Sequence, residues 1–181
     1  MNNIKKALYF ACEKHDGQYR KGGRIPYIAH PVLVVFGVQK YTSDEDVIAT
    51  ALLHDVLEDC PDVSIDILQK EFGDRITNLV KEVSFISDKK YATWKEKKEA
   101  YLEKIKDVSN DALVIIANDK ITNFQAYFNL LQKGSEVVKK FHGTPEEYYW
   151  YYNEVANILK TRLIDHLIIK EYCELLDSYK K

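Results

Sequence analysis

Hydrophobic residues recur along this chain at the three- and four-residue spacing of amphipathic helices, from the amino-terminal region to the carboxyl-terminal region. No run shows convincing alternation of apolar and polar residues, which is the mark of a half-buried strand. The pattern predicts helices over residues 3–15, 31–40, 44–59, 74–84, 91–106 and 109–131, a short helix after Ser64, and a last helical stretch over 144–178 with one break. We therefore predict an all-α fold, a single helical bundle.

Helix boundary residues support these segments. Asp16-Gly17 suits a helix end, and Pro31 suits the first turn of the helix that follows. Cys60-Pro61 predicts the end of the helix over 44–59, because proline cannot continue a helix. Thr144-Pro145 followed by two glutamates is a strong start signal. The segments are joined by short connections without linkers, repeats or low-complexity tracts.

Composition restricts the class of protein but does not indicate its function. A length of 181 residues suits one domain over 1–181, and 46% hydrophobic with 30% charged residues is ordinary for a soluble globular chain. The net charge of −2 gives no overall field that would recruit nucleic acid. No apolar run approaches the roughly 20 residues that a membrane span needs. The amino-terminal segment lacks the features of a signal peptide.

The three cysteines, Cys12, Cys60 and Cys173, are far apart and form no CxxC motif. Reduced thiols in a cytoplasmic protein are the expected state. We predict a cytoplasmic location, and the sequence does not indicate an oligomeric state.

Residues 51–59 (ALLHDVLED) place a histidine and three carboxylates on a helix whose other positions are apolar. At about 3.6 residues per turn, the ionisable residues continue the apolar side of the helix rather than opposing it. Unpaired buried charges cost several kcal/mol. These side chains therefore need a metal ion, a partner charge or a wet cavity.

Two further ionisable residues also stand beside hydrophobic runs. His30 precedes PVLVV, and Asp119 follows a run ending in LVIIAN. With His54 and Asp55 they give two imidazoles and two carboxylates, a ligand set suited to a catalytic divalent transition metal. Any one of them alone would be read as a helix cap or a satisfied core residue.

The remaining histidines favour structural roles. His15-Asp16 lies at a helix end, where an imidazolium interacts favourably with the helix dipole. His142 beside Gly143 is typical of a loop, and His166 is typical of a core or surface position. The cysteines are typical packing residues.

The combination H…HD…D resembles the HD-domain metal-dependent phosphohydrolases. Within them, the chain is similar to the hydrolase domain of RelA/SpoT-type alarmone enzymes, especially the small single-domain alarmone hydrolases. The resemblance rests on AxxxHxGQxRKGGxxPYIxHP at 11–31, ALLHDVxED at 51–59, FGxxIxxLVxEVS at 72–84 and DKxxN at 119–123. Asn118 departs from the family, which more often has alanine there; this departure affects packing rather than a ligand.

The resemblance implies one Mn²⁺ ion held by His30, His54, Asp55 and Asp119. It also implies that Glu58 and Asp59 position and activate the attacking water. The spacing agrees, because each of these carboxylates follows a ligand by four residues. Without the resemblance they would be an ordinary acidic helix end.

The resemblance further implies a nucleotide site. Arg20 and Lys21 match a nucleotide-contacting pair, Asn123 matches a residue near the metal, and Tyr151 lies where the family often has a tyrosine. An arginine plane stacks on a purine, and a lysine meets phosphate. A second basic group, Lys95, Lys97 and Lys98, either faces outer phosphates or is a solvated helix face.

The sequence thus predicts a Mn-dependent hydrolase that removes pyrophosphate from the 3′ position of guanosine alarmones, (p)ppGpp, the nucleotides of the stringent response. Its partner is a small-molecule nucleotide, not nucleic acid or a membrane. One alternative is another HD phosphatase acting on NADPH 2′-phosphate or nucleoside monophosphates. A different alternative is a non-catalytic nucleotide-binding module.

Overall fold

The computed structural model describes residues 2–21 and 23–178, and these fold into helices joined by loops. The elements are α1 (Asn3–Lys14), α2 (Ala29–Val38), α3 (Glu45–Leu53), α4 (Val56–Asp59), α5 (Ile65–Val83), α6 (Trp94–Ile105), α7 (Asn110–Gln132), the 3-10 helix η1 (Glu136–Lys140), α8 (Pro145–Arg162) and α9 (Leu167–Ser178). Within the described ranges there is no strand, only an isolated bridge between Tyr19 and Pro26. The predicted all-α fold is confirmed.

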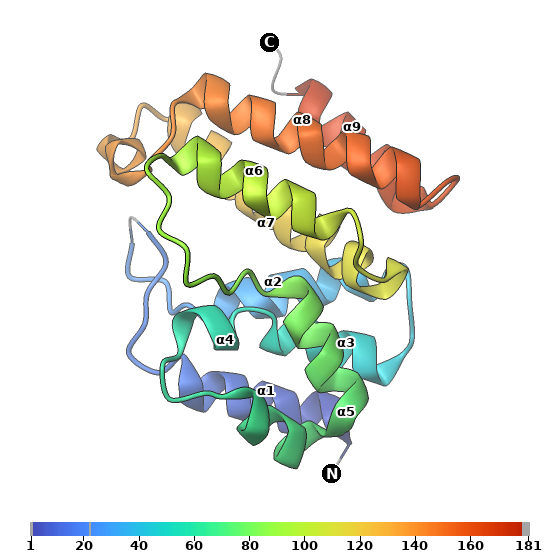
Figure 1. Cartoon of the computed structure of the whole chain (residues 1–181). Helices are drawn as coiled ribbons and strands as arrows, with labels where there is room; N and C mark the ends of the chain where they lie inside the picture. The colour runs from blue at the N-terminus through green and yellow to red at the C-terminus, as the bar shows by residue number, and fades with distance from the viewer. Residues whose placement is uncertain (1, 22, 179–181) are drawn as a thin grey trace.

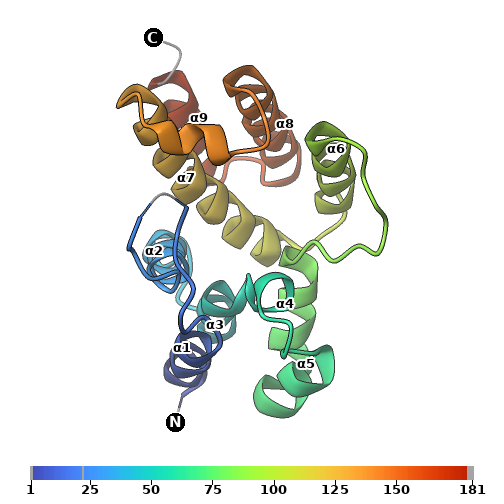
Figure 2. The ribbon, with the colours of Figure 1, turned by 90° about the vertical axis from the view of Figure 1, so that its left-hand side faces the viewer.

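The helices form two groups on either side of α7. Figures 1 and 2 show α1 to α5 gathered around the amino terminus and α6, α8 and α9 around the carboxyl terminus. Helix α7 contacts α2, α3 and α5 of the first group and α8 and α9 of the second. Seven successive residues of α7, Ala112 to Asn118, are buried, as its central position requires.

One prediction was wrong in detail: the helix expected over 44–59 is two helices. Helix α3 ends at Leu53, His54 and Asp55 form a turn, and α4 begins at Val56. The Glu58 amide bonds the Asp55 carbonyl, three residues back, rather than the His54 carbonyl. Ser84 Oγ lies 3.1 Å from that His54 carbonyl and shares its one proton between it and the Val80 carbonyl at 2.7 Å. A residue 30 positions away thus stabilises the break, and local periodicity cannot show it.

Other boundaries agree more closely with the pattern. Helix α2 begins at Ala29 and contains Pro31 in its first turn. Gly73 (φ 76°) kinks α5 where the sequence predicted two helices. Helix α6 begins at Trp94 rather than residue 91, because Thr93 caps it by accepting the Glu96 amide. The last helical stretch breaks once, between α8 and α9, and η1 was not predicted.

The buried amide of Asn118 explains how α2 and α7 approach closely. Its Nδ2 donates to the Val114 carbonyl at 2.8 Å, which satisfies the amide inside its own helix. A methyl group at Gly37 of α2 would lie 2.2 Å from Asn118 Oδ1. The Asn118 side chain therefore occupies the space that a side chain at position 37 would need, so this contact requires glycine at 37.

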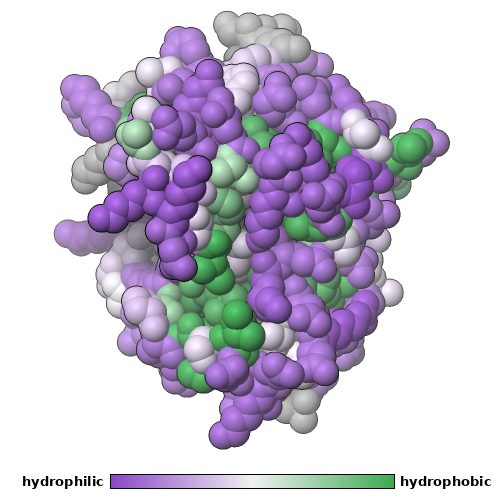
Figure 3. Space-filling view, viewed as in Figure 1, coloured by the Kyte–Doolittle hydropathy of each residue, from purple (hydrophilic) through white to green (hydrophobic). Residues whose placement is uncertain are grey.

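The surface in Figure 3 is hydrophilic over most of the displayed face. An apolar spot at its right edge lies at the turn between α8 and α9, where Ile164 and Leu167 are 75% and 74% exposed. Among the described helices, none has the length and apolar character needed to cross a bilayer.

Candidate metal centre and adjoining cavity

The structure brings together His30 from α2, His54 and Asp55 from the α3–α4 turn, and Asp119 from α7. His54 Nε2 lies 3.2 Å from His30 Nε2 and 3.1 Å from Asp55 Oδ2. Asp119 Oδ1 lies 3.0 Å from His30 Nε2 and 3.8 Å from His54 Nε2. His30, His54 and Asp55 offer ligand atoms that all lie within 4.8 Å of one another, and Asp119 Oδ1 adjoins them through its contact with His30. Imidazoles and carboxylates brought together from separate elements form a candidate metal centre.

Hydrogen bonds orient several of these side chains. His54 Nδ1 is 2.8 Å from the Ala51 carbonyl, which can only accept, so Nδ1 donates and Nε2 is the nitrogen that would bind a metal once it is deprotonated. The Tyr27 hydroxyl donates to Asp55 Oδ2 at 2.7 Å. Such outer contacts fix ring and carboxylate orientation around metals.

Asp119 accepts from two residues of its own helix. Asn123 Nδ2 donates to Asp119 Oδ1, and Lys120 Nζ pairs with Asp119 Oδ2, both at 2.5 Å. Desolvation alone would raise the pKa of Asp119, but Lys120 and His30 hold it well below its usual range. Asp119 therefore stays ionised although it is buried.

The two imidazoles are in different electrostatic states. Burial lowers the pKa of His30. Burial would lower the pKa of His54 as well, but Asp55 and Asp119 raise it to about 9. Desolvation opposes ionisation of Asp55 too, yet His54 and His30 hold its pKa below the usual value. The centre thus keeps two buried carboxylates ionised and attracts positive charge.

The predicted acidic pair lies on α4, directly after the ligand turn. Glu58 Oε1 accepts the Phe85 amide at 2.8 Å, and Asp59 lines the cavity that His30 also lines. Glu58 is exposed as a residue, but the surroundings of its carboxyl group desolvate it and raise its pKa. A carboxyl with a raised pKa is suited to proton transfer near neutral pH.

A cavity of about 770 Å³ opens beside the centre. Its volume is within the range of about 300–1,000 Å³ common for small-molecule sites. His30 and Asp59 lie on its wall with residues of the 17–28 loop, α6, α7 and α8. All four predicted substrate contacts line it: Arg20, Lys21, Asn123 and Tyr151.

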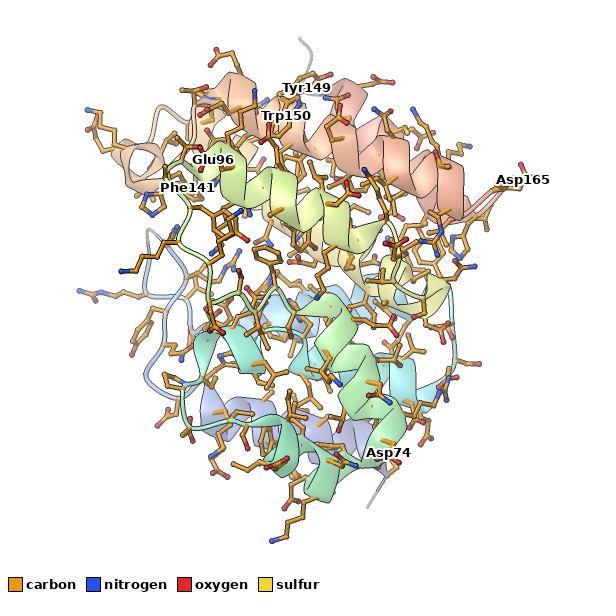
Figure 4. All side chains as sticks on the ribbon, viewed as in Figure 1. Asp74, Glu96, Phe141, Tyr149, Trp150 and Asp165 are labelled. Carbon is orange, nitrogen blue, oxygen red and sulfur yellow. The ribbon has the colours of Figure 1, made fainter. Side chains whose placement is uncertain are left out.

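Two of these predicted contacts, Arg20 and Asn123, are connected to the centre through hydrogen bonds. Arg20 donates to Asn123 Oδ1 at 2.7 Å, and Asn123 in turn bonds Asp119, one of the predicted ligands. Lys21 Nζ lies 5.0 Å from the ring of Phe141, which Figure 4 labels on the loop between η1 and α8. Gly22, also predicted to belong to this loop, lies outside the described residues.

Tyr151 and Lys98 form the inner wall of the cavity. Tyr151 is 2% exposed, and its hydroxyl has no hydrogen-bond partner among the described residues. Lys98 Nζ lies 4.8 Å from the Tyr151 ring, and burial lowers the pKa of Lys98 to about 7. Of the predicted basic group, only Lys98 lines this cavity; Lys95 and Lys97 are exposed on α6.

Sequence reasoning gave no role to Tyr27 or Lys120. Both lie inside the motifs on which the family resemblance rests, PYIxHP and DKxxN, and this position could have indicated a role at the site. Their contacts with Asp55 and Asp119 depend on the fold.

The remaining histidines and the cysteines lie outside the centre. His142 is a loop residue, and His166 lines a separate cavity near the α8–α9 turn, whose Asp165 is labelled at the right of Figure 4. His15 ends α1, as the sequence indicated, but it is buried, with 3% exposure. The three cysteines are free thiols.

Comparison with known proteins decides the family. The model of the family described as HD domain matches residues 7–144. The chain belongs to the HD-domain family. This assignment agrees with the family resemblance of the sequence motifs.

Two relatives that are similar in sequence carry the same description. The chain is 34% identical over 139 residues to a guanosine-3′,5′-bis(diphosphate) 3′-pyrophosphohydrolase of Aquifex aeolicus and 32% identical over 143 residues to one of Spiroplasma citri. These matches cover 76% and 77% of the chain, which spans only 19% of the length of either relative.

A solved structure supports the fold over nearly the whole chain. It is described as a metazoan ortholog of SpoT that hydrolyzes ppGpp and plays a role in starvation responses. The TM-score is 0.77 at 25% identity, and the match covers 99% of this chain and 96% of the other. The HD-domain assignment therefore holds for sequence and fold together.

Proposed function

We propose that this chain hydrolyses guanosine 3′-diphosphate alarmones, (p)ppGpp, and releases pyrophosphate. The observation that carries the proposal is that His30, one of the convergent histidine and aspartate residues, also lies on the wall of a cavity lined by Arg20, Lys21 and Lys98. A metal centre next to a cationic, aromatic cavity suits a phosphorylated nucleotide. The names of the relatives and of the matched structure support the same substrate class.

The ligand set fits one divalent transition metal, for which Mn²⁺ is the ion implied by the family resemblance. His30, His54, Asp55 and Asp119 would hold it; they provide nitrogen and oxygen donors of the type that manganese accepts. Two ionised carboxylates within a buried site supply charge that a divalent cation would neutralise. When bound, such an ion lowers the pKa of a coordinated water molecule.

Glu58 and Asp59 are proposed as the catalytic pair. Both carboxylates are on α4, which follows the ligand turn directly. In this role Glu58 accepts a proton from the attacking water, for which its raised pKa suits it. Asp59, on the cavity wall, orients that water toward the phosphorus.

The cavity side chains are proposed to hold the nucleotide. Arg20 stacks on the base, and Lys21 with Lys98 neutralises phosphate charge. Asn123 joins the nucleotide site to Asp119, and the Tyr151 hydroxyl offers a hydrogen bond from the inner wall. The reaction consumes one water and gives a nucleoside 5′-phosphate species and pyrophosphate.

We also propose that residues 1–181 form one domain and that the protein works in the cytoplasm in alarmone turnover. The free state of Cys12, Cys60 and Cys173 supports a reducing compartment.

A substrate panel tests the function. Purified protein is assayed with Mn²⁺, with Mg²⁺ and after chelation, on guanosine 3′,5′-bis(diphosphate), NADPH and guanosine monophosphate. We expect the highest kcat/KM on the alarmone, only in the presence of the transition metal. A preference for NADPH or the monophosphate would identify another HD phosphatase. Binding of the alarmone without turnover of any substrate would identify a binding module.

A further inference from the structure

A pair of side chains outside the proposed metal ligands, the buried His15 and the half-buried Gln18, joins the cavity loop to the acidic helix α4. His15 Nδ1 lies 2.8 Å from Gln18 Oε1. Gln18 Nε2 donates to the backbone carbonyl of Asp59 at 2.9 Å. Gln18 thus connects the end of α1 to the residue proposed to orient water.

The direction of these bonds is determined by chemistry. A backbone carbonyl can only accept, so the Gln18 amide nitrogen must face Asp59. The Gln18 oxygen then faces His15, so His15 Nδ1 must be the donor. His15 Nε2 is buried and has no hydrogen-bond partner in the described ranges. The bonds therefore run in one direction, from His15 through Gln18 to Asp59.

The same imidazole also supports the other end of the cavity loop. The rings of His15 and Tyr27 stack at 4.8 Å between centroids. Tyr27 closes the loop through its amide, which donates to the Gln18 carbonyl at 2.9 Å, and it bonds Asp55 through its hydroxyl. Arg20, within this loop, lies 5.6 Å from the Tyr27 ring. One buried ring thus contacts both ends of the loop.

We propose that His15 and Gln18 are positioning residues that hold the loop carrying Arg20 and the helix carrying Asp59 in one fixed arrangement. Neither side chain lines the cavity proposed to hold the nucleotide. Loss of their bonds lets α4 shift relative to the cavity, and a misplacement of about 1 Å costs up to about 10²-fold in rate. The effect on turnover rests on the proposed function; the coupling between loop and helix does not.

Four variants separate the effect of the His15–Gln18 hydrogen bond from that of the Gln18–Asp59 hydrogen bond. Gln18→Leu removes both hydrogen bonds, and Gln18→Glu keeps the acceptor for His15 but loses the donor to Asp59. His15→Phe keeps the ring on Tyr27 and loses the donor, whereas His15→Asn keeps a donor at the Nδ1 position and loses the ring. Gln69→Leu, on the exposed face of α5, is the matched control.

We expect kcat to fall about tenfold in Gln18→Leu, Gln18→Glu and His15→Phe, with KM changed less than about threefold. His15→Asn should recover part of the kcat lost in His15→Phe. A purely structural role would lower the melting temperature and leave the kcat of folded protein unchanged, which would overturn the proposal.

Hydrogen exchange gives a readout that needs no substrate. Gln18→Leu should speed amide exchange in both segments, 17–28 and 55–62, while α7 and the Gln69→Leu control stay at the wild-type rate. If the wild type hydrolyses none of the substrates but exchange rises in both segments, the proposed function fails and the coupling is supported. Faster exchange confined to the loop would overturn the coupling.

Discussion

The two imidazoles of the centre are held in different ways, although both are buried. His54 donates to the Ala51 carbonyl, whereas His30 Nδ1 has no hydrogen-bond partner among the described residues. His30 is instead oriented from its other side, where Nε2 lies 3.0 Å from Asp119. Metal ligands with an outer hydrogen bond have fixed tautomers. We infer that the orientation and tautomer of His54 are fixed more firmly than those of His30.

Removal of this ligand should release the metal. For His54→Ala we expect metal affinity to fall by at least about 10-fold, because even outer contacts of a metal ligand contribute 10–100-fold. Metal content per chain, measured after dialysis, checks this, with His142→Ala in the exposed loop as the control. Full metal occupancy with unchanged activity in His54→Ala would remove it from the ligand set.

The acidic pair should affect rate without affecting metal content. In Glu58→Gln with Asp59→Asn, the amides keep their shape but accept no proton, so kcat should fall by about 10²–10⁴-fold. The metal content and melting temperature should stay near the wild-type values, because Glu58 Oε1 bonds the Phe85 amide rather than a proposed ligand, and glutamine keeps that acceptor. Near-normal turnover of this double variant would make α4 an ordinary acidic helix end.

Lys98 should give the reaction a pH dependence near neutrality. Desolvation and Lys120 lower the pKa of Lys98 to about 7, so it is charged below that pH and loses its charge above it. A phosphate anion favours the charged form. Affinity for the nucleotide should therefore fall, and KM should rise, as pH increases through 7.

Comparison with Lys98→Met isolates this effect, since the other groups titrate in both proteins. The charged or titratable groups that act on Lys98 from α4, α6, α7 and α8 are Glu58, Lys97, Tyr101, Asp119, Lys120 and Tyr151. The KM of Lys98→Met divided by the KM of the wild type should be largest below pH 7 and approach one above it. A ratio independent of pH would exclude Lys98 as the titrating group.

At the scale of elements, the contact between α2 and α7 sets the distance between His30 and Asp119. Gly37 and Asn118 define that contact, because Asn118 occupies the space that a side chain at 37 would need. Asn118 is thus matched by a glycine on the facing helix.

A double-mutant cycle tests this pairing. Gly37→Ala alone should destabilise the protein by about 1–3 kcal/mol through overpacking. Combined with Asn118→Ala, the same change should be neutral or favourable, because alanine is a better helix former than glycine by about 1 kcal/mol. Urea denaturation of the four proteins gives the coupling free energy. Additive effects would mean that the two residues do not share this space.

Most helices could be predicted from the sequence, because the spacing of apolar residues is a local property of each segment. The metal-ligand candidates could be predicted because their motifs can be read directly from the sequence. The break at His54-Asp55 was not predicted, because Ser84 provides its hydrogen bond from another helix end. Nor was the distinction between Lys98 and its neighbours Lys95 and Lys97, since it depends on the packing of α6 against α8, which leaves Lys98 half-buried and the other two exposed. His15 shows the same limit: its helix-end position was predicted, but its contact with the loop was not.

At the scale of the whole molecule, the centre lies where the two groups of helices meet. The amino-terminal group provides His30, His54 and Asp55, and the central helix α7 provides Asp119 (Figures 1 and 2). The cavity wall adds α6 and α8 from the carboxyl-terminal group. Metal ligands and nucleotide contacts therefore depend on the same packing around α7.

Analysis of products by phosphorus NMR tests the central claim most directly. The Mn²⁺-loaded protein is incubated with guanosine 3′,5′-bis(diphosphate), alongside the chelated protein and Asp119→Asn. We predict equal amounts of guanosine 5′-diphosphate and pyrophosphate, formed only by the metal-loaded wild type. Release of orthophosphate, or equal turnover in the chelated protein and in Asp119→Asn, would contradict metal-dependent pyrophosphate release at this centre.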